Sequence, residues 1–187
     1  MTDLTEKKAA ARKAAFERRK AAFDLRLPGS AGRLSEVLAG YRGVPQSGYI
    51  PIRTEIDPLP AMAEAAAYGP VGVPVIQGAG QPLKFSRWTP EGTLKDGPFG
   101  AKVPEIEDYF DPEILIVPLV AFNASGGRLG YGGGFYDRTL ARLRANHPTL
   151  AIGFAFDGQE VAELPLEPTD QLLDMVVTES RVISIKS

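Results

Sequence analysis

Segment 126–138, GGRLGYGGGFYDR, combines the residue types that bind phosphate, and it holds six of the chain's 20 glycines within nine residues. Glycine loses more conformational entropy on folding than any other residue, so this density predicts positive φ angles or a backbone close to a ligand. A loop that leaves a strand and opens a helix also directs free N–H groups and the positive end of the helix dipole at one point. We predict a phosphate-binding loop. The structural alternative is a flexible glycine loop without a ligand.

Neither standard nucleotide-binding motif describes this loop. The sequence contains no GxxxxGK[ST], and the GxGxxG pattern fails at Phe135, where glycine is required. Arg128 and Arg138 flank the glycines and can pair with phosphate in bidentate fashion, while Asp137 could carry a hard divalent cation. Acidic and basic groups around one glycine loop indicate a nucleotide bound with its metal ion.

The N-terminal segment is a second source of cations. Residues 1–26 carry a net charge of +4, whereas the remainder of the chain carries −6. Their Ala, Lys, Arg and Glu content predicts a helix over residues 5–25. This helix should dock through a stripe formed by Ala15, Phe16, Ala22 and Phe23. Its charges either keep a solvated face soluble or supply cations to a phosphate ligand, and composition alone leaves both interpretations open.

The elements that must position these groups alternate between strand and helix. The apolar run 114–122 is typical of a strand buried on both faces of a parallel sheet. Asp57 is a suitable N-cap for a helix that begins at Pro58 and ends before Gly69. Further strands are predicted at 48–52, 71–77, 83–88, 149–156, 175–178 and 181–185, and further helices at 30–38 and 135–143. We predict an α/β fold: one Rossmann-like domain over residues 1–187, with an open, mostly parallel sheet flanked by helices and the basic helix of residues 1–26 docked on it.

Composition excludes several classes of function. The absence of cysteine rules out thiol catalysis, thiolate metal sites and disulfides, and a single histidine rules out a three-histidine zinc site. The net charge of −2 gives no reason to expect nucleic acid or an anionic membrane as partner. The N-terminus is too charged for a secretory signal, and no run of about 18 apolar residues occurs. We expect a soluble, cytoplasmic protein that is a monomer or weak dimer.

The glycine-rich segment resembles the signature of the 5-formyltetrahydrofolate cyclo-ligases, ATP-dependent enzymes of one-carbon metabolism also called 5,10-methenyltetrahydrofolate synthetases. The basic stretch KAAAR, from Lys8 to Arg12, resembles the N-terminal nucleotide contact of that family. IPIRTEID, residues 50–57, resembles its folate-contacting segment with Glu55 in the acidic position. LLDMVVTE resembles its C-terminal aspartate motif at Asp174. In order and spacing these motifs cover essentially the whole chain.

The resemblance implies a reaction driven by ATP. The formyl oxygen of 5-formyltetrahydrofolate attacks the γ-phosphate to give an iminium phosphate and ADP. The amine nitrogen N10 then adds to the same carbon and closes a ring, and phosphate leaves to give 5,10-methenyltetrahydrofolate. Phosphoryl transfer needs positioning and charge neutralisation more than a protein nucleophile, which agrees with a chain that has one histidine and no cysteine.

The resemblance also implies roles for particular residues. Arg128 and Tyr136 are expected to act on the reacting groups, and Asp137 with Asp174 to hold Mg²⁺. The folate should contact Ile50, Glu55, Phe99 and Tyr131. The nucleotide should contact Lys8, Arg12, Arg128, Leu129, Gly130, Tyr131, Gly132, Gly133, Gly134, Phe135, Tyr136 and Asp137.

Several alternatives stay open at this point. By composition Glu55 could be a solvated loop acid, and Phe99 could pin a long connection instead of covering a flat pterin. Thr169 stands before Asp170 where many family members resemble His-Asp, so no role for that histidine carries over. A non-catalytic nucleotide or phosphosugar sensor would use the same scaffold, and an RNA-binding accessory would use the basic arm.

Overall fold

The computed structural model describes residues 2–185 and is built around an eight-stranded sheet with the order β12-β11-β10-β7-β1-β2-β3-β6. The five central strands, β11 (Met175–Val177), β10 (Leu150–Phe154), β7 (Ile114–Val117), β1 (Gln46–Ser47) and β2 (Val71–Val75), are parallel. The outer strands β12 (Val182–Ser184), β3 (Lys84–Arg87) and β6 (Tyr109–Phe110) join through antiparallel pairs. The predicted α/β class with a mostly parallel sheet is therefore confirmed.

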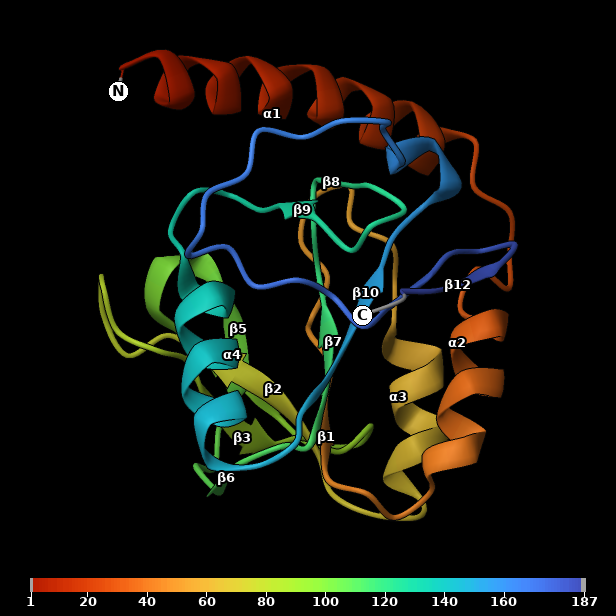
Figure 1. Cartoon of the computed structure of the whole chain (residues 1–187). Helices are drawn as coiled ribbons and strands as arrows, with labels where there is room; N and C mark the ends of the chain where they lie inside the picture. The colour runs from red at the N-terminus through yellow and green to blue at the C-terminus, as the bar shows by residue number, and fades with distance from the viewer. Residues whose placement is uncertain (1, 186–187) are drawn as a thin grey trace.

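The helices cover both faces of this sheet. Figure 1 shows α4 (Phe135–Asn146) on one side, α2 (Gly32–Leu38) and α3 (Leu59–Ala66) on the other, and α1 (Thr2–Asp24) lying across one end over β8 and β9. The remaining elements are β8 (Ala121–Phe122), β9 (Arg128–Leu129), β4 (Leu94–Asp96), β5 (Lys102–Pro104) and three short 3-10 turns, η1 (Ala39–Tyr41), η2 (Pro98–Gly100) and η3 (Asp157–Gln159).

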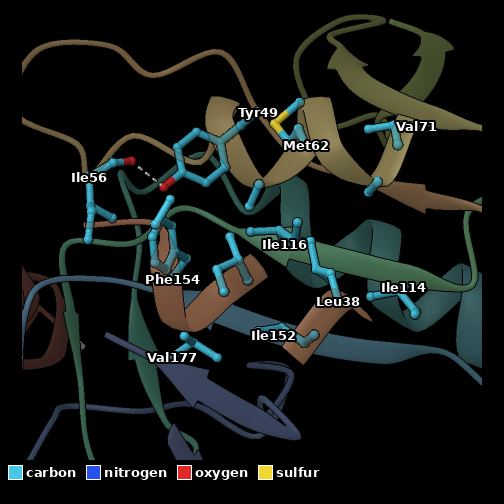
Figure 2. Packing of buried hydrophobic residues seen from close by; sticks show 14 of the residues in the cluster. Leu38, Tyr49, Ile56, Met62, Val71, Ile114, Ile116, Ile152, Phe154 and Val177 are labelled. Carbon is cyan, nitrogen blue, oxygen red and sulfur yellow. Dashed lines mark hydrogen bonds between the residues drawn. The ribbon is translucent and has the colours of Figure 1, made fainter. Parts of the chain in front are cut away.

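Alternate residues of strand β7 pack into the helix layers on opposite faces of the sheet. Ile114 and Ile116 pack with Met62 of α3, whereas the alternate residues Leu115 and Val117 pack with the α4 side. Figure 2 shows the first of these layers, in which side chains from α2 and α3 meet those of β7, β10 and β11. All four β7 residues are buried, as the apolar run predicted.

The connections place a topological switch between β1 and β7. Helix α3 connects β1 to β2 on one face, while the chain after β7 passes through β8, β9 and α4 to β10 on the opposite face. The two connections therefore diverge at the carboxyl ends of β1 and β7. Open α/β sheets bind ligands in the crevice that this divergence leaves.

Two predicted strands differ from the structure. The chain after β1 leaves the sheet at Gly48, so the strand predicted at residues 48–52 is wrong; Pro51 has no N–H to donate to a ladder. The run 114–122 is divided at Pro118, and its second half, β8, pairs with β9 in a separate two-stranded sheet. Both departures carry the chain out of the sheet at its carboxyl edge, where they form walls of a cleft.

The three helices predicted in the N-terminal half are present as α1, α2 and α3, with ends shifted by a few residues. The side chain of Asp57 accepts the N–H of Leu59 at 2.9 Å, although the helix begins at Leu59 rather than at Pro58. Helix α1 docks through the predicted stripe, with Ala15 fully buried. Among residues 2–185, no helix has the length and apolar composition that a membrane crossing requires.

Candidate active site

A cleft of about 740 Å³ lies at the carboxyl ends of the central strands. Its walls come from the segments that follow β1, β2 and β7, from the β9–α4 loop and from α1. Every residue that the sequence predicted to contact nucleotide, folate or metal lines this cleft, with the exception of Asp174. The fold therefore brings together residues that lie as far apart in the sequence as Lys8 and Asp137.

The glycine loop forms the floor of one half of the cleft. Gly132 has φ 102° and Gly134 has φ 68°, so the left-handed conformation predicted from glycine density is confirmed at both positions. Gly134 immediately precedes α4, whose N-terminus faces the same space. In the described part of the chain, the N–H groups of Gly132, Gly133 and Gly134 donate to no protein acceptor. These N–H groups are available to an anion.

Two arginines donate hydrogen bonds to carbonyl groups of the glycine loop. Arg12 of α1 donates from Nε to the carbonyl oxygen of Gly130 at 2.8 Å, and Arg138 donates from Nη2 to that of Gly133 at 2.6 Å. A Cβ built on Gly132 would lie 3.5 Å from the Arg12 guanidinium. Two guanidinium groups thus approach the loop that presents free N–H groups, which is the arrangement predicted for a phosphate site.

Two buried donors beside the loop lack partners. Arg128 is 8% exposed; its Nη2 donates to Oδ1 of Asp137 at 2.6 Å, but its Nε has no partner among the described residues. The hydroxyl of Tyr136 is likewise buried and unpartnered there. Burial raises the pKa of the Tyr136 phenol, so it keeps its proton and remains a donor at neutral pH. Unmet donors are costly to bury, so a bound acceptor would stabilise both.

Lys8 enters the cleft from α1 but is engaged by carboxylates. Its Nζ lies 2.7 Å from Oε1 of Glu167 and 3.3 Å from Oδ2 of Asp170. Partial burial lowers the pKa of Lys8, but the hydrogen bond to Glu167 and the charge of Asp170 outweigh it, so the pKa lies above its ordinary value. Lys8 is therefore charged. Thr169 lies between these carboxylates and also lines the cleft.

Glu55 occupies the other half of the cleft, where it is held by a local turn. The N–H of Glu55 donates to the carbonyl of Ile52 at 3.1 Å, and the N–H of Ile52 donates back to Glu55 Oε1 at 2.9 Å. The turn puts Arg53 at φ 53°, a backbone conformation that residues other than glycine rarely adopt. Glu55 is only 6% exposed, so the composition-based reading of a solvated loop acid is wrong. Strain of this kind tends to persist where a site requires the geometry.

Burial raises the pKa of the Glu55 carboxyl above its ordinary value. The hydrogen bond that Tyr131 donates to Oε2 at 2.7 Å, the Ile52 N–H and the charge of Arg19 act in the opposite direction. The buried Glu55 carboxylate accepts two hydrogen bonds from the protein and keeps further lone pairs. It can therefore accept hydrogen bonds from N–H groups of a ligand.

Arg19 is a further residue beside the cleft that the sequence motifs do not predict. This α1 residue is fully buried and donates from Nη1 to the Tyr131 hydroxyl at 2.6 Å and from Nε to Oγ1 of Thr54 at 2.9 Å. Lys8, Arg12, Ala15 and Arg19 follow one another at i, i+4, i+7 and i+11, so they share one face of the helix. That spacing, with a small apolar residue inside a row of cations, is the signal that would have revealed it.

Ile50 and Phe99, which were predicted to contact folate, both line the cleft. Ile50 lines the cleft next to the Glu55 turn. Phe99 is 72% exposed with φ 59°, and its ring centroid lies 6.3 Å from that of Phe135 in a tilted pair. Phe99 is therefore placed at the cleft mouth and not in the core, which counts against a role as a core anchor.

The structure does not bring Asp174 to the cleft. Its Oδ2 accepts from Nη2 of Arg144 at 2.9 Å and from the N–H of Ala151 at 2.8 Å. Asp174 immediately precedes β11, so it lies at the amino end of the strand, the edge opposite to the ligand crevice. The expectation that Asp174 shares a metal with Asp137 is therefore not supported, and its contacts describe a structural role.

Asp137 is the better placed of the two carboxylates for a metal. It lies in the first turn of α4 and lines the cleft, with Oδ1 also accepting the N–H of Gln171 at 2.9 Å. Within residues 2–185 no group of three or more His, Asp or Glu side chains could hold a metal ion by itself. Mg²⁺ typically takes one or two carboxylates and completes its shell with phosphate oxygens and water, so Asp137 fits such an ion only together with a bound phosphate.

Comparison with known sequences identifies relatives of one kind. Residues 4–179 match the model of the 5-formyltetrahydrofolate cyclo-ligase family. A 5-formyltetrahydrofolate cyclo-ligase of Mycolicibacterium smegmatis is 30% identical over 167 residues, which cover 83% of this chain and 84% of that protein. The cyclo-ligase of Haemophilus influenzae is 40% identical over 101 residues, or 51% of this chain. The chain spans only 54% of the length of this second relative.

Solved structures give the same grouping. The 5,10-methenyltetrahydrofolate synthetase of Aquifex aeolicus superposes with a TM-score of 0.73 at 27% identity, covering 96% of this chain and 93% of that one. A synthetase from Mycoplasma pneumoniae shares the fold, with a TM-score of 0.66 at 21% identity over 92% of this chain and 99% of that one. The match over residues 4–179 and the relative that is 30% identical across most of both chains show that this chain belongs to the 5-formyltetrahydrofolate cyclo-ligase family.

Proposed function

We propose that this protein catalyses the ATP-dependent conversion of 5-formyltetrahydrofolate to 5,10-methenyltetrahydrofolate, with release of ADP and phosphate. The observation that carries the proposal is the division of one cleft into two chemically different halves. One half presents free glycine N–H groups and arginines, and the other presents the buried Glu55 carboxylate between apolar walls. Family membership supplies the reaction that joins an anionic and a heterocyclic substrate in such a cleft.

The nucleotide half fits a triphosphate. The N–H groups of Gly132, Gly133 and Gly134 and the α4 N-terminus would face the phosphates, and Arg12 and Arg128 would neutralise them. Lys8 would give up its ion pairs with Glu167 and Asp170 and bind phosphate instead. The two carboxylates would stay in the cleft lining. Arg128 Nε and the Tyr136 hydroxyl are the two donors that a transferred phosphoryl group would satisfy.

Magnesium belongs to the proposal through Asp137. A bound Mg²⁺ would neutralise phosphate charge and orient the triphosphate. Asp137 now shares Oδ1 between Arg128 and the Gln171 N–H, so its Oδ2 is the free ligand atom. We propose one protein carboxylate, with phosphate oxygens and water as the other ligands.

The folate half fits a pterin. A deprotonated Glu55 accepts hydrogen bonds from the amino and ring N–H groups of the pterin, and Ile50 and Phe99 supply apolar contact. Tyr131 links the halves, because it lies in the glycine loop and donates to Glu55. This arrangement would direct the formyl oxygen toward the phosphate site.

The chemistry then requires no protein nucleophile. The formyl oxygen forms a bond to the γ-phosphorus while the bond from that phosphorus to the ADP oxygen breaks. N10 next forms a bond to the formyl carbon and loses its proton as the C–O bond to phosphate breaks. Arg128 and Tyr136 would stabilise the charge that develops on the transferred oxygens.

The test incubates the purified protein with 5-formyltetrahydrofolate, ATP and Mg²⁺ and follows the methenyl chromophore in the near ultraviolet. We expect its appearance to require all three components and to yield one ADP per product. The variant Tyr136→Phe serves as a matched probe: the rate should fall about 10- to 100-fold with the fold intact. Tight ATP binding by the parent without any chromophore would favour the non-catalytic nucleotide sensor instead.

A further inference from the structure

Arg19 is buried where an arginine is expensive to place. Its side chain is 0% exposed, and its hydrogen bonds go to Tyr131, Thr54 and the carbonyl of Leu119, none of which carries a negative charge. Its Nη2 is buried without a partner in the described part of the chain. Neutral residues of similar size would pack the α1 interface without this cost. Docking of α1 alone therefore does not explain why a guanidinium is buried at this position.

The directions of the hydrogen bonds give that reason. A guanidinium has only donors and a carboxylate only acceptors, so the Tyr131 hydroxyl between them must accept from Arg19 and donate to Glu55. The distances are 2.6 Å from Arg19 Nη1 to the hydroxyl and 2.7 Å from the hydroxyl to Glu55 Oε2. Arg19 thereby fixes the orientation of the phenol proton. The Tyr131 ring is further held by the Arg19 guanidinium carbon, 5.4 Å from its centroid.

We propose that Arg19 is a positioning residue of the folate site, which acts through the Tyr131 hydroxyl to hold the Glu55 carboxylate as an acceptor for the pterin. This inference rests on the proposed function, because it assigns the partner of Glu55. Arg19 itself touches no substrate. Its guanidinium sets the direction of one hydrogen bond and adds positive charge near Glu55.

The surroundings of Glu55 give the proposal a readout that packing alone would not produce. Glu55 faces Arg19 of α1, Tyr131 of the glycine loop, Tyr136 of α4, and Arg53 and Tyr49 of its own segment. Burial raises the pKa of each of these tyrosines, so the tyrosines stay protonated. Glu55 is the member of this group that titrates on the acid side. Loss of the Arg19 charge must raise its pKa and move the loss of folate binding to higher pH.

The test measures binding of 5-formyltetrahydrofolate by calorimetry without ATP, and binding of ATP separately, across a pH series. We expect Arg19→Met to weaken folate binding about tenfold at neutral pH, with recovery toward the parent affinity as pH rises. Arg19→Lys keeps the charge and should keep the midpoint of the pH profile near that of the parent. Lys13→Met removes the same charge from the exposed face of α1 and should change neither profile.

A double-mutant cycle tests the relay itself. Tyr131→Phe removes only the hydroxyl and should cost a similar factor in folate affinity, and the double variant should be no worse than the poorer single variant within about twofold. Additive losses, an unchanged pH midpoint in Arg19→Met, or an equal loss of ATP affinity would each overturn the proposal. If Arg19→Met does not fold, the pH profiles of folate binding are measured for Tyr131→Phe and Arg19→Lys instead. The proposal then requires weaker folate binding in Tyr131→Phe and a midpoint near that of the parent in Arg19→Lys. A parent that binds no folate would refute the proposed function instead.

Discussion

The carboxyl and amino edges of the central sheet both carry arginines, but they differ in how the donors of these arginines are paired. At the carboxyl edge, Arg128 Nε and the Tyr136 hydroxyl line the cleft and are buried without partners in the described chain. At the amino edge, Asp174 accepts from both Arg144 and the Ala151 N–H. Since nearly all buried polar groups in proteins are paired, a cluster of unmet donors marks the edge that awaits a ligand. Charge alone would not have separated the two edges.

The largest expected difference between the edges concerns two arginines. Arg128→Met removes a preorganised donor from the cleft, and we expect kcat/KM to fall about 100- to 1000-fold. Arg144→Met removes an arginine of α4 at the amino edge and should leave kcat/KM within about twofold. Both variants are checked by the chromophore assay and by thermal melting. A similar loss of activity in both would erase the distinction between the edges.

Within the carboxyl edge, Glu55→Gln separates the folate half from the nucleotide half. An amide keeps the size of the side chain but replaces an acceptor-only group, so hydrogen bonds to a charged partner worth about 1.5–3 kcal/mol are lost. The KM for 5-formyltetrahydrofolate should rise about 10- to 150-fold while that for ATP stays nearly constant. If both constants rise together, Glu55 supports the cleft as a whole.

A smaller effect is expected from adding one methyl group to the glycine loop. A Cβ on Gly130 meets no heavy atom within 4 Å, so Gly130→Ala should fold normally, and only a ligand would feel the methyl group. Gly40 has equally open space and is the matched control. We expect Gly130→Ala to weaken ATP binding about tenfold and Gly40→Ala not at all, measured by calorimetry. Gly133 is a poorer probe, because a Cβ there would lie 2.7 Å from the Phe135 ring.

The smallest effect should come from Asp174→Asn. Loss of a half-exposed ion pair with Arg144 and weakening of the bond to the Ala151 N–H should cost about 1 kcal/mol, which lowers Tm by roughly 2–4 °C. The Mg²⁺ concentration needed for half-maximal rate should not change, whereas Asp137→Asn should raise it. A higher Mg²⁺ requirement in Asp174→Asn would restore the metal role that its position in the structure does not support.

The comparison of the edges also shows what the sequence could reveal. The glycine loop was predictable because only glycine adopts the φ angles of Gly132 and Gly134 without strain. The parallel core was predictable from the uninterrupted apolar run of β7. Asp174 was predicted to reach the carboxyl edge of the sheet, but it comes just before β11 and therefore lies at the amino edge. The position of Asp174 before this strand was already visible in the sequence.

Arg19 was harder to predict. The helical spacing places Arg19 on the same face as Lys8 and Arg12, but its hydrogen bonds to Tyr131 and Thr54 are tertiary contacts that the spacing does not give. For Arg19, long-range packing decided the outcome over local preference. The exit of the chain from the sheet after Gly48 had a local signal in Pro51, although the surrounding residues have the composition of a strand.

The most direct test of the account follows backbone amide signals by NMR while a non-hydrolysable ATP analogue and then 5-formyltetrahydrofolate are added. The nucleotide should shift the amides of Gly132, Gly133 and Gly134, and the folate should then shift those of Ile52 and Glu55. The amides of Ala151 and Asp174 at the opposite edge should stay in place. Shifts centred on Ala151 and Asp174, with the glycine loop unmoved by nucleotide, would contradict the assignment of the cleft.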